Sequence, residues 1–161
     1  MYIREIVDND WRHIEAIQAQ SYYEIKPEAL SVLQSKCRVS PQTCKVCIRR
    51  EAVMGYLLAH PWLHLVPPKL HEEIKCIEEA CSRIYLHDLA VAQQARHEGV
   101  ARRLMEDFLA TASEYNYQEI ILVSVQQSEV FWSKYGFKKV DHVDICHSYG
   151  PNRQLMIKTM S

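Results

Sequence analysis

The sequence predicts an α/β (α+β) fold, in which helices flank a mixed sheet that contains one parallel crossover. A hairpin pattern lies within residues 44–59, where two apolar, β-branched runs flank a charged dipeptide. An amphipathic helix pattern spans Gly99–Tyr115. This helix lies between two strand patterns, Ile84–Val91 and Ile120–Val125. A strand, a helix and a second strand in this order form a parallel unit.

The first quarter of the chain predicts one strand and two helices. Residues Tyr2–Val7 alternate as in a strand. A helix follows, because four side chains recur along one face: Trp11, Ile14, Ile17 and Ser21. Asp8 or Asp10 is expected to cap this helix. Pro27 opens a second short helix, whose apolar side comprises Leu30, Val32 and Leu33.

Two hairpin strands and a long excursion follow. The strands are Cys44–Arg49 and Ala52–Ala59, and the prolines that come next prevent the second strand from running on. The segment His60–Ser82 is therefore expected to leave the sheet, with a short helix at Leu70–Ala80.

The last third completes the sheet. Ile120–Val125 lacks alternation, which indicates a strand that is buried on both faces. A short helix, Ser128–Tyr135, stops at a glycine. Two antiparallel strands, Phe137–Cys146 and Gln154–Thr159, finish the chain. The expected order is β-α-α-β-β-β-α-β-α-β-β, in a single domain that spans residues 1–161.

Composition excludes several classes of partner. Nineteen basic and twenty acidic residues give a net charge of −1, whereas proteins that bind nucleic acid or anionic lipid are usually basic. The start has no apolar run of the signal-peptide kind. No stretch approaches the roughly 18 apolar residues of a membrane span. We therefore expect a cytoplasmic protein with no nucleic-acid partner and no membrane contact.

Six cysteines raise the alternative of a metal- or redox-linked regulator. Cys44 and Cys47 form a C-x-x-C pair, but no second close pair or histidine pair follows at ligand spacing. Their segment also has the pattern of a strand, which turns residues three apart to opposite faces. Buried or idle thiols and no bound metal are the prediction.

The segment Leu89–Ala101 joins the central strand to the long helix and suggests a phosphate site. A helix start has backbone N–H groups without acceptors and a partial positive charge, so it attracts anions. Gly99 lets the backbone approach a bulky anion, and three arginines add positive charge: Arg96, Arg102 and Arg103. The alternative is an ordinary turn, in which the glycine only relieves strain.

Two motifs in this region resemble those of the GNAT superfamily of acyl-CoA-dependent N-acyltransferases. Arg96-His-Glu-Gly99-Val-Ala101 fits its R/Q-x-x-G-x-G/A signature. Phe131-Trp-Ser-Lys-Tyr-Gly-Phe137 resembles its second signature, an aromatic pair followed by x-x-x-G-F. The motifs span roughly a third of the chain, and the expected helix and buried strand lie between them.

The resemblance implies an acetyl-CoA-dependent N-acetyltransferase with six to seven mostly antiparallel strands, about four helices and a splayed central strand pair. Acetyl-CoA is then the acyl donor. Its pyrophosphate is expected on the loop that comprises Arg96, His97, Glu98, Gly99, Val100, Ala101 and Arg102. The pantetheine arm is expected to pair with the backbone of Leu89, Ala90 and Val91, and an amide near Leu89 to polarise the thioester carbonyl.

His87 is the candidate base that takes a proton from the attacking amine. It lies two residues before Leu89, so alternation turns it toward the gap between the splayed strands, with Tyr85 on the same face and Asp88 opposite. The strand also looks like that of the serotonin N-acetyltransferase branch, where histidines at the places of Tyr85 and His87 serve a proton path. The alternative is a core histidine whose nitrogens are satisfied by protein groups.

One departure concerns the thiolate that leaves. Many relatives have a tyrosine at the place of Trp132, where its hydroxyl protonates the thiolate. An indole N–H can donate a hydrogen bond but is no acid near neutral pH, so Trp132 is expected only to line the cofactor site. Tyr135, three residues on, is the candidate substitute acid, with packing against the sheet as the alternative.

The acceptor is expected to be a small-molecule amine or a peptide or protein amine. The resemblance implies that it meets the segments Ser21–Ile25 and His147–Arg153, and the excursion offers a further wall. Candidate contacts are Tyr22, Tyr23, Glu24, His60, Trp62, His64 and Tyr149. The alternative function is an acyl-CoA-binding sensor or scaffold with little turnover. Dimers are common among similar proteins, so a homodimer is one option.

Overall fold

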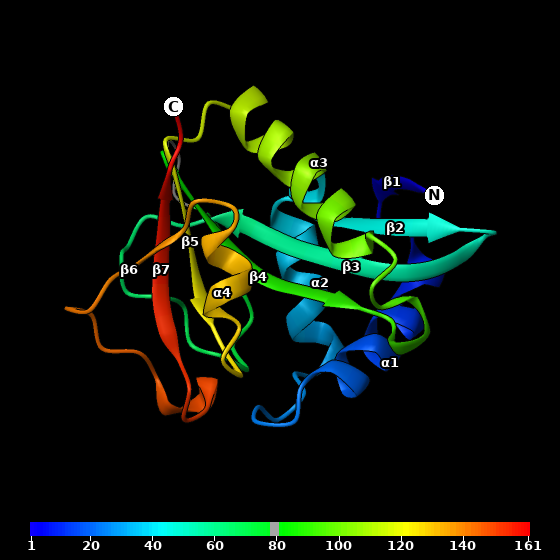
Figure 1. The fold of residues 1–161 in the computed structure, drawn as a ribbon, viewed down its shortest axis with the longest axis horizontal. Coiled ribbons are helices and arrows are strands. Elements are labelled where there is room, and N and C mark those ends of the chain that lie inside the picture. Colours follow the sequence, from blue (N-terminus) through cyan, green and yellow to red (C-terminus); the bar gives the residue numbers. More distant parts are fainter. Residues whose placement is uncertain (78–80) are drawn as a thin grey trace.

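The computed structural model describes residues 1–77 and 81–161, which form a seven-stranded sheet in the order β1-β2-β3-β4-β5-β7-β6 (Figure 1). The strands are β1 Tyr2–Glu5, β2 Lys45–Arg49, β3 Ala52–Pro61, β4 Arg83–Val91, β5 Glu119–Ser124, β6 Lys138–Lys139 and β7 Gln154–Thr159. The α-helices are α1 Trp11–Ser21, α2 Leu30–Val39, α3 Val100–Glu114 and α4 Glu129–Ser133. The β4–β5 pairing is parallel and the others are antiparallel, which confirms the predicted fold class and element order.

Helices cover both faces of the sheet, with α3 on one face and α1 and α2 on the other (Figure 1). Two neighbours on β3 show the division. A Cβ added to Gly55 would lie 2.8 Å from Cγ1 of Val100, so the missing side chain lets α3 approach the sheet. The next residue, Tyr56, points to the other face, where its hydroxyl donates to Asp88 over 2.6 Å.

The core lies between the sheet and these helices. The buried side of α3 comprises Val100, Leu104, Met105, Phe108, Thr111 and Ala112. On β5, Ile120, Ile121 and Leu122 are all buried, which confirms a strand covered on both faces. In the described part of the chain, no helix has both the length and the apolar character that crossing a membrane requires.

The central strands β4 and β5 separate halfway along their length. They pair from Arg83 with Glu119 to Leu86 with Leu122. Beyond that point β4 continues against β3 as far as Val91, and β5 continues against β7. The splayed pair that the resemblance implied is therefore confirmed.

A bulge marks the place where the strands separate. Leu58 on β3 is opposite Asp88, whereas the next residue, Ala59, is opposite Leu86. His87 is thus an extra residue on β4, and the side-chain alternation changes at this point.

The helix predicted at 70–80 is wrong for residues 70–77, which form turns and irregular backbone; residues 78–80 lie outside the described part. Side chains bind two backbone amides of this segment. The N–H of His71 donates to Glu28 Oε2 over 2.9 Å, and that of Ile74 donates to Ser35 Oγ over 3.0 Å. These two hydrogen bonds fasten the segment to α2 and the residues before it.

The strand predicted at 137–146 is also wrong, since β6 holds only two residues. The chain makes one more backbone bond, from Val140 N–H to the Leu155 carbonyl, and then leaves the sheet. The helix predicted from Pro27 begins at Leu30. The predicted caps are wrong as well, because the Asp10 carboxylate accepts bonds from Arg4 and the Val7 amide rather than from α1.

The two cysteines of the C-x-x-C pair lie on opposite faces of the sheet. Cys44 is buried beside Cys37 of α2, and its thiol donates to the Ala59 carbonyl. Cys47 is buried on the α3 side, near Arg103. Within residues 1–77 and 81–161, no three histidine, cysteine or acidic side chains gather as a metal site would require.

Candidate active site

A pocket of about 290 Å³ lies where β4 and β5 separate. Its walls come from β4 and β5, from the segment between α1 and α2, from α4 and from the start of α3. Among its lining residues are Tyr22, Glu28, Leu86, His87, Asp88, Leu89, Ala90, Val91, Arg96, Ala101, Leu122, Phe131, Trp132 and Tyr149. Segments far apart in sequence therefore meet at one concave site, as ligand sites in open sheets require.

The loop before α3 forms one end of the pocket. Gly99 has φ +84°, a left-handed conformation that side chains disfavour, and a Cβ there would meet nothing within 4 Å. Glycine is thus required by the backbone conformation and not by crowding. The first-turn amides of α3 have no carbonyl four residues earlier in the helix, and the helix dipole adds positive charge there. This end can accept an anion.

The three arginines of this region have different surroundings. Arg96 is exposed and lines the pocket. Arg102 pairs with Glu106 over 2.8 Å, and Arg103 donates to the Met1 carbonyl over 2.9 Å. Glu98 binds Arg49 of β2, and both side chains are partly exposed. Of the three arginines, Arg96 is the one that lines the pocket.

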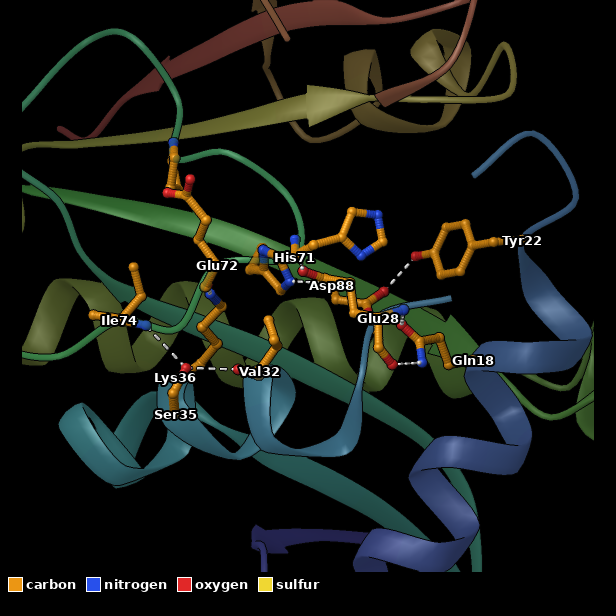
Figure 2. A network of polar contacts seen from close by, with 12 residues as sticks. Gln18, Tyr22, Glu28, Val32, Ser35, Lys36, His71, Glu72, Ile74 and Asp88 are labelled. Carbon is orange, nitrogen blue, oxygen red and sulfur yellow. Dashed lines mark hydrogen bonds and ion pairs between the residues drawn. The ribbon is translucent and has the colours of Figure 1, made fainter. Parts of the chain in front are cut away.

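His87 and Glu28 form a buried pair at the bulge. His87 Nε2 lies 2.6 Å from Glu28 Oε1, and the two side chains are only 1% and 4% exposed. Glu28 also receives the His71 amide on its second oxygen, and its backbone exchanges hydrogen bonds with the Gln18 side chain (Figure 2). Burial raises the pKa of Glu28, but the neighbouring His87 ring and the His71 N–H outweigh it and lower the pKa to about 2.

Asp88 lies beside this pair, contrary to the alternation pattern. Its carboxylate accepts hydrogen bonds from the hydroxyls of Tyr22 and Tyr56. Both Asp88 and His87 contact side chains of the α1–α2 side and line the same pocket, because the bulge turns consecutive residues to one face. The prediction that Asp88 faces away from His87 is therefore wrong. Burial raises the pKa of Asp88.

Tyr85 lies next to His87 but does not line the pocket. Its ring is 6.0 Å from the His87 ring, and the side chain is fully buried. Its hydroxyl is 2.9 Å from the hydroxyl of Tyr149, which in turn donates to the Pro68 carbonyl. Burial raises the pKa of Tyr85 well above its usual value. Tyr149 thus connects the pocket to the excursion between β3 and β4.

The two aromatic residues of the second motif have separate places. Trp132 is buried, lines the pocket and donates its indole N–H to Ser128 Oγ over 3.1 Å. Tyr135 lies outside the pocket lining and packs against Phe131, with ring centroids 5.4 Å apart. Its place outside the lining, against Phe131, favours the packing alternative for Tyr135.

The residues expected to meet the acceptor divide into two groups. Tyr22 and Tyr149 line the pocket. The others lie elsewhere: Tyr23 is 80% exposed, Glu24 accepts from Asn152, His60 is a buried residue of β3, and Trp62 packs between His60 and His64.

Sequence reasoning missed two residues of the site. Glu28 is the partner of His87. Gln126 binds the amides of Tyr23 and Glu24 and the carbonyl of Ser21, which ties the α1–α2 segment to the segment after β5. The available signal for Glu28 was its place next to the segment 21–25, which the resemblance assigned to the acceptor.

Comparisons with known proteins agree with this architecture. The family model of a GNAT acetyltransferase domain matches residues 70–148. Ard1 from Thermoplasma volcanium is 19% identical with a TM-score of 0.74, covering 99% of this chain and 97% of that one. Naa50 from Arabidopsis thaliana, in complex with the bisubstrate analogue CoA-Ac-MVNAL, is 16% identical with a TM-score of 0.72, covering 99% and 98%. The GNAT-like decarboxylase GphF, in complex with isobutyryl-CoA, is 17% identical with a TM-score of 0.73, covering 99% of each chain.

No curated protein matches the chain at the level of sequence. The family model covers both signature motifs, and solved structures match the fold over nearly the whole chain. The splayed strands, the glycine before α3 and the aromatic motif of α4 are the features on which the predicted resemblance depends. Residues 70–148 match the GNAT acetyltransferase domain within a fold shared with these solved structures, which supports the predicted resemblance to the GNAT superfamily.

Proposed function

We propose that this chain is an N-acetyltransferase that transfers the acetyl group of acetyl-CoA to a primary amine by direct attack in a ternary complex. The observation that carries the proposal is the pocket at the β4–β5 split, which runs from the start of α3 to the His87–Glu28 pair. It has an anion-binding end and a proton-accepting end within one cavity. The CoA-peptide conjugate on Naa50 supports an arrangement of this kind.

The cofactor is assigned to the first of these ends. The amides of residues 96–102 hold the pyrophosphate, with Arg96 as countercharge. The unpaired edge of β4 at Leu89, Ala90 and Val91 pairs with the pantetheine arm, and an amide near Leu89 stabilises the oxyanion of the tetrahedral intermediate. Trp132 forms the opposite wall.

The proton steps are assigned to His87 and to the thiolate. His87 takes one proton from the acceptor ammonium, and the anionic Glu28 stabilises the imidazolium that forms. The neutral amine then attacks the thioester carbon. When the intermediate collapses, the C–S bond breaks, nitrogen loses a second proton and the thiolate gains one. A thiol whose ordinary pKa is about 8.5 is a tolerable leaving group without a protein acid.

The test is a screen for CoA-thiol release from acetyl-CoA, with small amines, polyamines, amino acids and short peptides as acceptors. We expect release that depends on one acceptor class and on a free amine, with mass spectrometry showing the acetylated product. Release without an acylated product would contradict amine transfer. We place the activity in the cytoplasm, in keeping with the composition of the chain.

A second candidate function is an acyl-CoA sensor or scaffold with little turnover. The Trp132 indole is bound to Ser128, and Tyr135 lies outside the pocket, which favours this alternative because neither group can protonate a thiolate there. Tight acetyl-CoA binding in calorimetry together with no thiol release across the whole panel would select the sensor. Steady turnover with any amine would exclude it.

A further inference from the structure

Two buried histidines each have one ring nitrogen without a partner among the described residues: His60 Nε2 and His87 Nδ1. His60 lies on β3 and is fully buried. Its Nδ1 is 2.9 Å from the Pro61 carbonyl, which can only accept, so the proton is on Nδ1 and Nε2 carries a lone pair. Burial lowers the pKa of His60 to about 3, so the ring is neutral at physiological pH.

The same reasoning orients the His87 ring. Its Nε2 lies 2.6 Å from the carboxylate of Glu28, which is anionic, so Nε2 carries a proton. In the neutral ring, Nδ1 is therefore an acceptor. A buried polar atom without a hydrogen bond costs about 1–3 kcal/mol, so two such nitrogens in one region call for a common partner.

The sheet brings these two rings to one place. His60 is directly opposite Tyr85 in the β3–β4 pairing, and His87 lies two residues further along β4. Both imidazoles flank the Tyr85 ring, at 5.7 and 6.0 Å between centroids. A water that contacts both ring nitrogens would therefore lie next to the Tyr85 ring.

We propose that one buried water bridges His60 Nε2 and His87 Nδ1, and that His60 is thereby a positioning residue for the base of the proposed acetyl transfer. With both rings neutral, the water donates one hydrogen to each nitrogen. His87 Nδ1 is buried, so the substrate proton reaches it through the water: the water oxygen takes the proton as one of its hydrogens passes to Nδ1, and the water still donates to His60. His60 thus supplies the acceptor at the end of the chain, and it never exchanges its own proton. The water bridge itself does not depend on the proposed function, whereas the catalytic role of His60 rests on it.

Several charged and titratable groups surround His60 and His87. Glu28 faces His87 from the α1–α2 segment, and Asp88 follows His87 on β4. Lys36 of α2 lies buried near Glu28 and donates to the Glu72 carbonyl (Figure 2). Tyr85 is bound to Tyr149. Within residues 1–77 and 81–161, each of these groups has a protein hydrogen-bond partner, so none of them needs the proposed water.

The first experiment needs no substrate. Imidazole nitrogen NMR of the purified chain should show His60 as the Nδ1–H tautomer and His87 with a proton on Nε2. His60→Gln retains an acceptor near the position of Nε2, and His60→Phe removes it. We expect the His87 nitrogen signals to move in His60→Phe and much less in His60→Gln, with no change in the exposed control His142→Phe. Unchanged His87 signals in folded His60→Phe would overturn the proposal.

The second experiment measures catalysis once an acceptor amine is known. Loss of the acceptor disfavours the protonated His87 ring, so His60→Phe should lower kcat about tenfold, leave KM within about twofold, and move the acidic limb of the kcat/KM profile to lower pH. His60→Gln should restore most of the rate. An unshifted pH profile would contradict the positioning role. If the wild type shows no turnover, the proposed function is contradicted. The NMR experiment then tests the water bridge by itself.

Discussion

At the scale of single residues, the site depends on the His87–Glu28 pair, of which only His87 was predicted from the sequence. His87 follows from its spacing before Leu89 and from the family resemblance. Glu28 does not, because it is 59 positions away and meets His87 only after α1, α2 and β4 pack together. A contact between residues so far apart in sequence leaves no local pattern, so side-chain partners were the least predictable part of the site.

Replacing Glu28 by glutamine should reduce stability in a pH-dependent manner. The pKa of Glu28 is about 2 in the folded chain, against 4.5 for a free side chain. A carboxylate with a lowered pKa stabilises the fold above its unfolded pKa, and this stabilisation is lost as the pH falls through its folded pKa. We expect Glu28→Gln to be less stable by about 3 kcal/mol at pH 7, and this difference to shrink between pH 5 and pH 2.

Urea unfolding at pH 7, 5 and 3 measures this difference. Glu15→Gln, at an exposed position of α1, is the matched control and should show no such trend. If the loss in unfolding free energy of Glu28→Gln stays constant from pH 7 to pH 3, the negative charge of Glu28 is not its cause.

Turnover should separate His87 from Tyr135. His87 lines the pocket, so His87→Ala removes the base and should lower the rate by more than tenfold. Tyr135 packs on Phe131 outside the pocket, so Tyr135→Phe should lower the rate by less than about tenfold. Rates of both variants at several pH values give the comparison, and the reverse order would remove His87 as the base.

At the scale of elements, prediction succeeded where periodicity decides structure and failed where side chains compete for the backbone. The strong repeat of 99–115 became α3, Val100–Glu114. The expected helix at 70–80 did not form in residues 70–77, where Glu28 and Ser35 bind the amides of His71 and Ile74. The left-handed pair Arg50 and Glu51 closes the predicted β2–β3 hairpin.

Two glycines should respond differently to alanine. In Gly55→Ala, the new Cβ would lie 2.9 Å from the backbone oxygen of Ala90 on β4 and 2.8 Å from Val100 on α3, so both elements must move, at a cost of up to about 3 kcal/mol. In Gly99→Ala, the Cβ meets open space and only the left-handed φ is strained, at a cost of about 1 kcal/mol. Urea unfolding compares them, and a larger loss for Gly99→Ala would refute the close approach of α3.

At the scale of the whole molecule, the order of elements was readable from one sequence because each strand and helix has its own pattern. The splay of β4 and β5 came only from the family resemblance. The bulge at His87 was not predicted, since a one-residue shift in pairing depends on both strands and not on either alone. That shift decides that His87 and Asp88 share a pocket.

Binding of CoA should stabilise the whole fold. A ligand that binds only the native state at 100 times its Kd adds about 2.7 kcal/mol, which raises the Tm of a chain of this size by about 5 °C or more. Thermal unfolding with CoA measures the shift, and pantetheine, which lacks the diphosphate, should produce much less. No shift with millimolar CoA would contradict an anion site at the start of α3.

The outermost strand, β6, has a consequence for association between chains. It offers only two residues at the sheet edge, Lys138 and Lys139, and Lys139 is paired with Glu129 of α4 over 3.0 Å. A neighbouring molecule that added a strand here would find a very short ladder and would have to approach two ammonium groups. Short, lysine-bearing edges are a common protection against edge-to-edge aggregation. The two-residue β6 is therefore a poor template for cross-β growth when the chain is heated or concentrated.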